Sequence, residues 1–363
     1  MNTAAIVEDL DTYTACLVQP VIKFAYKRDD ISENLERYLG LIDTVARRFG
    51  SPSAPLKLMA FPEFFLQGFT TRPDIDMDYY KREILITLPG PESDRLAAKA
   101  RQHGIYILGC ALELDERLPE YFFNTAFIIN PEGEIVHKYR KAIPAIHAEM
   151  AMSPHDLLSR YMALYGQKKD VLATVFPVTD TPIGRIGTFI CMDGHFPEVT
   201  RAMALQGAEV LVRPTAFPEP LVSSPMNTWE LQNRVRAHEN MAYVLAPNTG
   251  GLITSELPTC FTPGDTMAVD YNGLIIGRAP YPGESIVCVE INLRGLRARR
   301  QDPRRNFLTQ IRSELFQDMY KDPIYPQDLF LADALQDRKG VSGRSPKQVI
   351  DAFNKLGIFR EPS

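Results

Sequence analysis

The sequence predicts an α/β fold in which mixed β-sheets are covered by outer helices. Apolar segments typical of strands alternate along the 363 residues with segments whose apolar side chains recur at helical spacing. Hairpin signals occur among them, and antiparallel hairpins between strand–helix units are typical of mixed sheets. The pattern of the first half recurs in the second, so two such halves could pack sheet against sheet.

The first half of the chain begins with a strand and a long helix. Residues 31–49 are expected to be helical because Leu35, Leu39 and Ile42 recur at helical spacing. Residues 92–103 are expected to form a helix that ends at Gly104, since glycine is typical just after a helix. Strands are expected at 14–21, 56–61 and 105–114, and alternating apolar residues predict a hairpin whose strands lie at 123–129 and 134–139 around the turn 130–133.

The second half follows the same rules. Helices are expected at 197–206 and 225–240, and the insertion at 150–170 also carries apolar residues at helical spacing. Strands are expected at 171–178, 185–191, 208–213, 242–247, 266–270, 274–278 and 285–292.

Composition and charge exclude several classes of protein. A net charge of −5 argues against a nucleic-acid binder, which usually presents a basic face. No apolar run approaches the length of a transmembrane helix, and the first residues lack the pattern of a signal peptide. The 5 cysteines are scattered without a CxxC pair or a Cys/His cluster, so neither a zinc site nor a disulfide framework is indicated. Free thiols favour a reducing compartment, and we expect a cytoplasmic protein.

Three stretches carry candidate chemistry, and each is weak evidence alone. Glu63 follows a buried strand, and site residues in α/β folds lie at such strand ends. Lys141 ends the basic run HKYRK, with Glu149 eight residues later. Cys191 ends an apolar strand just before a helix signal, in a strand–turn–helix step like that of a nucleophile elbow. The ordinary alternatives are a loop carboxylate, a solvated lysine and a small buried cysteine.

Taken in order, these stretches resemble the nitrilase (carbon–nitrogen hydrolase) superfamily over roughly residues 14–300. The resemblance lies in FPE at 61–63, YRK at 139–141 and CMDGHFPE at 191–198. It is strongest to the aliphatic amidase and formamidase branch, in which a lysine is followed by a proline and, eight residues on, a second glutamate. The resemblance implies a four-layer α-β-β-α sandwich with a catalytic domain at 1–293. Residues 294–363 would be an extension that packs on the core or on a neighbouring subunit.

The resemblance also implies a cysteine-dependent amidase that releases ammonia through a thioester acyl-enzyme. Glu63, Lys141 and Cys191 would form the catalytic triad, with Glu149 as a fourth member. A thiol needs a base to attack a carboxamide, and a carboxylate beside a lysine can supply it. Lysine and the backbone N–H of Met192 would then stabilise the oxyanion. No metal or organic cofactor is expected, and the partners would be a small amide substrate and further copies of the chain in a homo-oligomer.

The expected substrate-binding residues are Phe64, Ala145, Met192, His195 and Phe217. Ala145 stands where the small-amide branch carries a large aromatic residue, and the insertion 150–170 is longer than in that branch. Both departures favour a bulkier amide. We expect side chains of the insertion to line or cover the enlarged pocket as a lid, namely Leu157, Tyr161, Met162 and Tyr165.

Other functions remain open at this point. An N-carbamoyl-amino-acid hydrolase would share the triad and would use His147, His195 or Arg213 to hold a substrate carboxylate. A nitrilase is disfavoured because Met192 and Asp193 replace the usual Trp-Glu. A Cys/His pair of Cys191 with His195 is possible, although a histidine that caps a turn is the simpler interpretation. A noncatalytic scaffold of the same fold is the alternative from a different class.

Overall fold

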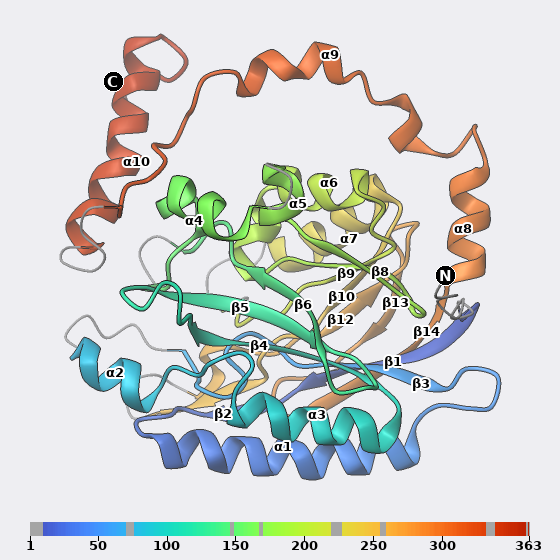
Figure 1. Ribbon diagram of the computed structural model, residues 1–363. Helices are drawn as coiled ribbons and strands as arrows, with labels where there is room; N and C mark the ends of the chain where they lie inside the picture. The colour runs from blue at the N-terminus through green and yellow to red at the C-terminus, as the bar shows by residue number, and fades with distance from the viewer. Residues whose placement is uncertain are drawn as a thin grey trace, which may run out of the picture.

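The computed structural model describes residues 10–69, 76–145, 149–166, 170–218, 227–254, 259–331, 338–360 and 362. Two six-stranded sheets pack face to face, and helices cover the outer face of each sheet (Figure 1). The four-layer α-β-β-α sandwich is therefore confirmed. Between the layers lie three buried apolar clusters, one under each helical layer and one between the sheets.

The first sheet has the strand order β14-β1-β3-β4-β5-β6. Its last strand in sequence, β14, pairs antiparallel with its first, β1, so the end of the chain returns to the first half. The central strands β1, β3 and β4 are parallel, and β4, β5 and β6 form an antiparallel meander. The strands span Thr12–Gln19 (β1), Leu56–Ala60 (β3), Tyr106–Leu114 (β4), Phe122–Ile129 (β5), Ile135–Arg140 (β6) and Ser285–Asn292 (β14).

The second sheet has the order β13-β12-β10-β9-β8-β7, with β8, β9 and β10 parallel at its centre. The strands span Val178–Thr181 (β7), Gly184–Thr188 (β8), Val210–Val212 (β9), Tyr243–Ala246 (β10), Met267–Val269 (β12) and Ile275–Arg278 (β13). Two further short strands, Val21–Lys23 (β2) and Gly251–Ile253 (β11), pair in parallel outside both sheets.

Strand alternation divides each strand between two of the apolar layers. On β1, Ala15 and Leu17 face the second sheet, while Cys16 and Val18 face the outer helices. Successive side chains of a strand point to opposite faces, so a strand buried on both sides reads as a continuous apolar run. This explains why the central strands are recognisable from the sequence.

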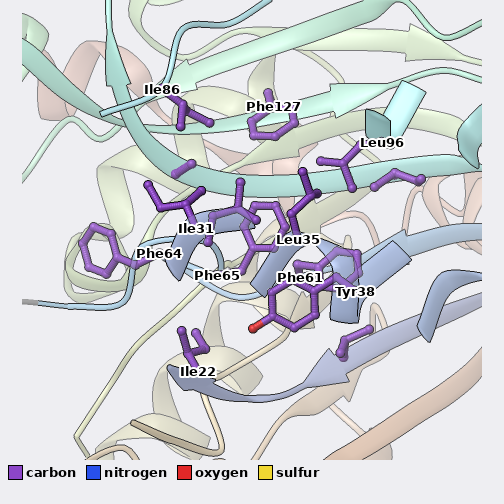
Figure 2. Close-up of a cluster of buried hydrophobic side chains, with 14 of the residues drawn as sticks. Ile22, Ile31, Leu35, Tyr38, Phe61, Phe64, Phe65, Ile86, Leu96 and Phe127 are labelled. Atoms are coloured by element: carbon purple, nitrogen blue, oxygen red, sulfur yellow. The ribbon is translucent and has the colours of Figure 1, made fainter. Parts of the chain in front are cut away.

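Helices of the first half cover the first sheet. Helix α1 (Arg28–Arg48) turns Ile31, Leu35 and Tyr38 toward Phe61 and Phe65, as Figure 2 shows. Helix α3 (Pro91–His103) ends at Gly104, whose φ of 62° is the left-handed conformation expected there. The short α2 (Met77–Glu83) was not predicted.

Helices of the second half cover the second sheet. Helix α6 (Pro197–Leu205) packs through Val199 and Met203, and α7 (Thr228–Asn240) through Trp229 and Ala237. The prediction of one strand over residues 171–178 is wrong. Residues Val171–Val175 form the short helix α5, and Asp170 caps it by accepting a hydrogen bond from the N–H of Ala173 at 3.2 Å. The β-branched residues of this segment favour a strand, but Asp170 before them caps a helix.

The insertion forms the turn η1 (Pro154–Leu157) and helix α4 (Leu158–Tyr165). Its side chains Leu157, Tyr161 and Tyr165 pack in a separate cluster with Phe123 of β5. The rings of Phe123, Tyr165 and Tyr161 surround Arg140, with centroids 4.3, 4.9 and 5.6 Å from its Cζ. The expected lid is therefore wrong for Leu157, Tyr161 and Tyr165, because they pack with Phe123, on the face of β5 opposite to that of Asn124, which contacts Glu63.

Residues after β14 form helix α8 and then an extended arm. Leu293 and Leu296 of α8 are buried in the layer between the sheets, so the start of the expected extension belongs to the core. The arm passes over α4–α6 (Figure 1) and contacts the insertion, where the Ser159 N–H donates to Asp328 Oδ1 at 2.8 Å and the Phe330 N–H donates to the Asp156 carbonyl at 3.0 Å. Its elements span Leu293–Gln301 (α8), Phe307–Gln310 (η4), Ser313–Phe316 (α9), Gln317–Tyr320 (η5) and Arg338–Lys355 (α10).

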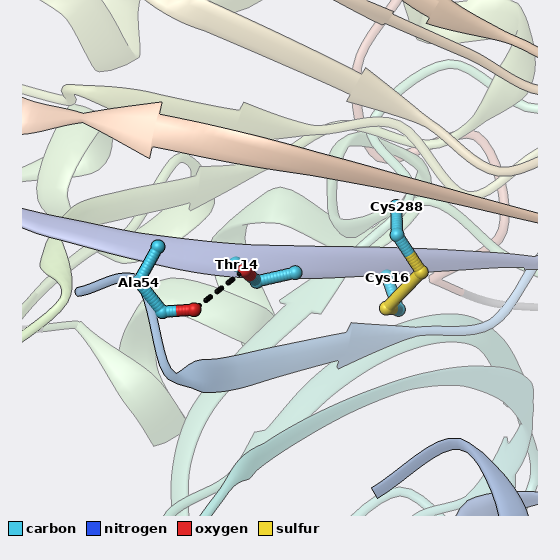
Figure 3. Close-up of a disulfide and its surroundings, with 4 residues drawn as sticks. All are labelled: Thr14, Cys16, Ala54 and Cys288. Carbon is cyan, nitrogen blue, oxygen red and sulfur yellow. Dashed lines mark hydrogen bonds between the residues drawn. A yellow bond between two sulfur atoms is a disulfide. The ribbon is translucent and has the colours of Figure 1, made fainter. Parts of the chain in front are cut away.

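Cys16 on β1 lies opposite Cys288 on β14, and their sulfur atoms are bonded (Figure 3). The expectation of free thiols is therefore wrong for this pair. The two cysteines are 272 residues apart in sequence, and only the antiparallel pairing of β1 with β14 brings them together. The argument from free thiols to a cytoplasmic protein loses this support. None of the helices in the described part of the chain has the length and apolar character needed to cross a lipid bilayer.

We predict that Arg140→Met destabilises the protein by about 3–5 kcal/mol, because it leaves the buried carboxylates of Glu113 and Asp115 with only the Lys138 ammonium, which binds Glu113. Arg140 Nε and Nη2 donate to Glu113 at 3.0 and 3.1 Å, and Nη2 also binds Asp115. Urea unfolding would measure the change. The matched control is Arg185→Met, whose exposed pair with Asp180 should contribute less than about 1 kcal/mol. Equal losses for the two variants would contradict this account.

Candidate active site

Glu63 enters the interior three residues after β3 ends. Its side chain is 1% exposed and is held by three donors from different parts of the chain. Lys141 Nζ and Asn124 Nδ2 donate to Oε1 at 2.8 and 2.7 Å, and the N–H of Ala216 donates to Oε2 at 2.9 Å. Ala216 follows β9 of the second sheet, so this carboxylate joins the carboxyl-end loops of both sheets.

Lys141 is the first residue after β6, and its side chain is completely buried. Its N–H donates to the carbonyl of Asn124 at 2.9 Å, which continues the β5–β6 pairing and turns the ammonium away from the Arg140 side of the sheet. The ammonium contacts Glu63 Oε1 and Glu149 Oε1. A buried cation is stable when carboxylates compensate its charge, and this lysine has two.

Glu149 lies against the lysine and is hydrogen-bonded to Ala145 through its backbone and its side chain. The Glu149 N–H donates to the Ala145 carbonyl at 2.9 Å, and the Ala145 N–H reaches Glu149 Oε1 at 3.3 Å. The eight-residue spacing seen in the sequence thus brings Lys141 and Glu149 into direct contact.

Asn124 is not among the residues predicted from the sequence, and it lies at the centre of this cluster. Its Nδ2 donates to Glu63 at 2.7 Å and to Glu149 at 3.4 Å, while its Oδ1 accepts from Cys110 Sγ at 3.3 Å. A buried asparagine within the otherwise apolar strand FFNTAFII is the signal that could have found it. The Cys110 thiol is therefore hydrogen-bonded to Asn124 beside the site, in addition to packing as a small apolar side chain.

Cys191 stands on the sharp turn between β8 and α6. It is the first residue of a single 3₁₀ turn, η2 (Cys191–His195), and its φ of 45° is left-handed. Phe64, directly after Glu63, also has a left-handed φ, 56°. Residues other than glycine adopt this conformation at a cost, and such strain is concentrated at functional sites.

Asp193 joins the Cys191 turn to the segment around Lys141 by hydrogen bonds. Its Oδ2 accepts from Tyr139 Oη at 2.7 Å and from the Ile190 N–H at 2.8 Å, and its Oδ1 accepts from the Ile143 N–H at 2.9 Å. Burial raises the pKa of Asp193 to about 6. The aspartate of the DG pair thus fixes the Cys191 turn relative to the segment after Lys141.

Glu63 and Lys141 shift each other's pKa values, and the charge of Glu149 acts on both. Burial raises the pKa of Glu63, Lys141 opposes this shift, and the charge of Glu149 adds to it. Burial lowers the pKa of Lys141, but the two carboxylates outweigh burial and hold it well above its usual range. The lysine is therefore charged, and Glu63 is a carboxylate whose proton affinity exceeds the ordinary value.

The thiol of Cys191 lies in the field of the same groups. Burial raises its pKa above the usual range; Glu63 and Glu149 raise it further, while Lys141 and Arg213 lower it. The thiol is thus mostly protonated at neutral pH and needs a base before it can act as a nucleophile. The structure brings Glu63, Lys141, Glu149 and Cys191 into one electrostatic cluster.

The expected substrate-binding residues divide between the two sides of this cluster. Phe64 and Ala145 adjoin the carboxylates, and Phe64 is buried. Met192 and His195 belong to the Cys191 turn, and the rings of His195 and Phe217 lie 5.9 Å apart. The exposed His195 also approaches the Met192 carbonyl with Nδ1 at 3.3 Å, as a turn-capping histidine does.

The residues expected to hold a substrate carboxylate in the N-carbamoyl alternative are less favourable. Arg213 is fully buried and makes hydrogen bonds to the chain itself, so it is not available to a carboxylate. His147 lies outside the described residues. Within the described ranges, no three His, Cys, Asp or Glu side chains are grouped as metal ligands would be.

Known proteins are similar to this chain in sequence. A family model described as carbon–nitrogen hydrolase matches residues 14–301. A formamidase of Bacillus cereus (strain Q1) is 31% identical over 253 residues, covering 69% of this chain and 66% of the formamidase. The match thus spans slightly less than two thirds of that relative's length.

Solved structures share the fold. Nit3 of Saccharomyces cerevisiae, described as a member of branch 10 of the nitrilase superfamily, has a TM-score of 0.62 and 25% identity, covering 83% of this chain and 97% of Nit3. An amidase from Nesterenkonia sp. has a TM-score of 0.59 and 19% identity, covering 87% of this chain and 100% of the amidase.

We predict that alkylation of Cys191 by iodoacetamide accelerates with pH up to at least about pH 9, because only the thiolate reacts and burial raises the thiol pKa. Mass spectrometry of the peptide that contains Cys191 would give the rate at each pH, and glutathione treated in parallel is the reference for an unperturbed thiol. A rate that already levels off below about pH 7 would mean that the thiol pKa is lowered, contrary to this prediction.

Proposed function

Because the chain belongs to the carbon–nitrogen hydrolase family, whose model matches residues 14–301, we propose that it is a cysteine-dependent amidase. It hydrolyses a non-peptide carboxamide to a carboxylic acid and ammonia. The observation that carries this proposal is the buried contact of Lys141 with both Glu63 and Glu149, whose charges all act on the Cys191 thiol.

The first half-reaction forms a thioester. Glu63 takes the proton of the Cys191 thiol, and Sγ attacks the carbonyl carbon of the amide. The Lys141 ammonium and the N–H of Met192 stabilise the oxyanion of the tetrahedral intermediate. Glu63 then gives its proton to the amide nitrogen, the C–N bond breaks, and ammonia leaves the acyl group on Sγ.

The second half-reaction regenerates the thiol. A water molecule gives a proton to Glu63 or Glu149 and attacks the thioester carbonyl, and the same two donors stabilise the second oxyanion. The C–S bond breaks, the carboxylic acid leaves, and the proton returns to Sγ. A carboxylate of raised pKa suits this exchange, because a group that takes and gives a proton works best when its pKa approaches the working pH.

Two observations bear on the size of the acyl group, and they differ in direction. The formamidase among the relatives is named for the smallest amide. Ala145 instead favours a larger one, because a small side chain beside Glu149 leaves volume for an apolar acyl group. We propose the larger class, with pocket walls other than Leu157, Tyr161 and Tyr165, since these three side chains pack elsewhere.

An N-carbamoyl-amino-acid hydrolase remains the second candidate. It rests on HFPE at 195–198 and on the position of His195 beside Phe217, where an exposed imidazole could meet a substrate carboxylate. An N-carbamoyl amino acid therefore belongs in the substrate panel, where its hydrolysis in place of simple amides would favour this candidate.

We predict that Cys191→Ala abolishes ammonia release, and that Glu63→Gln and Lys141→Ala each lower kcat by about 100-fold or more. The reason is that all three side chains act in the transition state. The assay measures ammonia from aliphatic, aromatic and carbamoyl amides.

The matched control for Glu63→Gln is Glu198→Gln, a carboxylate of the α6 surface that binds Tyr320 and should leave kcat within about twofold. Retention of more than a few per cent of wild-type turnover by Cys191→Ala would exclude the thiol mechanism, and full activity of Glu63→Gln would exclude its role as the base.

We predict that kcat/KM rises from formamide and acetamide to a branched and an aryl amide, by up to about 0.8 kcal/mol for each buried methylene. Ala145→Trp should reverse this preference by filling the volume beside Glu149. Ala173→Trp, on α5 and outside the catalytic cluster, should not. A wild-type preference for formamide that Ala145→Trp leaves unchanged would refute the enlarged pocket.

A further inference from the structure

Arg213 follows β9 and is a fully buried cation with an unusual set of partners. Its Nε and Nη2 donate to the carbonyl of Cys191 at 3.2 and 2.7 Å. Nη2 also donates to Gln232 and Nη1 to Asn233, at 2.7 and 2.8 Å. Among the described residues it forms no ion pair, so its charge is compensated by neutral oxygens. Burying a guanidinium in this way is costly and calls for a function.

The backbone of Cys191 is held on both sides by residues 213 and 214. The Cys191 N–H donates to the Pro214 carbonyl at 3.1 Å, and the Cys191 carbonyl accepts two hydrogen bonds from Arg213. These hydrogen bonds hold both peptide groups of Cys191, the residue whose φ of 45° is left-handed. Strained backbone persists only where its surroundings determine it, and here the surroundings include the guanidinium.

Gly194 provides the space for the guanidinium. A Cβ atom at this position would lie 2.2 Å from both Cζ and Nη2 of Arg213, far inside contact distance. A glycine is thus required three residues after Cys191, because any side chain there would clash with the Arg213 guanidinium. The ring of Trp229 also packs against the guanidinium, with its centroid 4.8 Å from Cζ of Arg213.

We propose that Arg213 is a positioning residue for the Cys191 nucleophile. Its guanidinium fixes the Cys191 carbonyl, and with it the left-handed turn, and provides a buried positive charge for the thiolate. The part of this proposal that concerns turnover rests on the amidase function proposed above.

The charges around the two groups are consistent with this role. Burial lowers the pKa of Arg213 to about 10, which leaves it charged at neutral pH, and the Cys191 thiol raises it. Arg213 and Lys141 lower the pKa of the thiol, against Glu63 and Glu149. The other charges that act on Arg213 are Arg236, which lowers its pKa, and Asp193 and Glu63, which raise it.

The test compares Arg213→Met and Arg213→Lys with a matched control, Arg300→Met. Arg300 is a partly buried arginine of α8 that donates to the carbonyls of Met241, Gly207 and Ala208. Three quantities are measured: the melting temperature, the pH midpoint of Cys191 alkylation by iodoacetamide, and kcat and KM for the best amide.

Arg213→Met should lower kcat by about 100-fold with little change in KM, and should raise the alkylation midpoint by about one pH unit or more. Arg213→Lys should recover part of both losses, because it keeps the charge. Arg300→Met should lower only the melting temperature. A melting-temperature loss in Arg213→Met without a shift of the midpoint or of kcat beyond the control would overturn the proposal.

Gly194→Ala decides the question if Arg213→Met does not fold, because it displaces the guanidinium without removing it. The proposal requires a raised alkylation midpoint in Gly194→Ala, and an unchanged midpoint in this variant would refute it. Alkylation needs no substrate. A shifted midpoint in a protein that hydrolyses no amide would therefore support the role of Arg213 while rejecting the amidase assignment.

Discussion

The contact of one buried lysine with two buried carboxylates is the constraint on which the rest of the site depends. Lys141 has no exposed surface, and its ammonium lies between Glu63 and Glu149. Burial raises the pKa of Glu63 although Lys141 opposes this shift, and burial together with the two carboxylates opposes ionisation of the nearby thiol. The proton of Cys191 therefore has a nearby acceptor. The burial that makes these charges costly in free energy thus also raises the proton affinity of Glu63, as a base requires.

The two halves of the molecule each supply one part of this arrangement. The first sheet provides both carboxylates and the lysine, and the second provides the strained Cys191 turn. Hydrogen bonds join the parts: the Ala216 N–H donates to Glu63, and the Ile143 N–H and Tyr139 Oη donate to Asp193. Because the sheets pack face to face over a continuous apolar layer, the distance between base and nucleophile is set by the core of the protein.

Local sequence signals predicted much of the fold, and the family resemblance singled out Glu63, Lys141 and Glu149, which lie in contact, but not the residues that support them. Strands buried on both faces read as apolar runs, and Gly104 marked the end of its helix as expected. Long-range geometry was not readable: Cys16 and Cys288 pair only because the last strand returns to the first. The alternation of side chains along β5 explains why the insertion does not form the predicted lid. Phe123 and Asn124 are neighbours on β5 that face opposite sides, and the insertion packs on the Phe123 side.

The most direct test of the central claim, that Cys191 carries the acyl group, is intact-protein mass spectrometry of the enzyme quenched with acid during turnover. The account predicts a mass increase equal to the acyl group of the amide, located on the peptide that contains Cys191 and removed by hydroxylamine. Glu149→Gln should accumulate this species if Glu149 activates the water. Turnover without any adduct, or an adduct on another residue, would contradict the account.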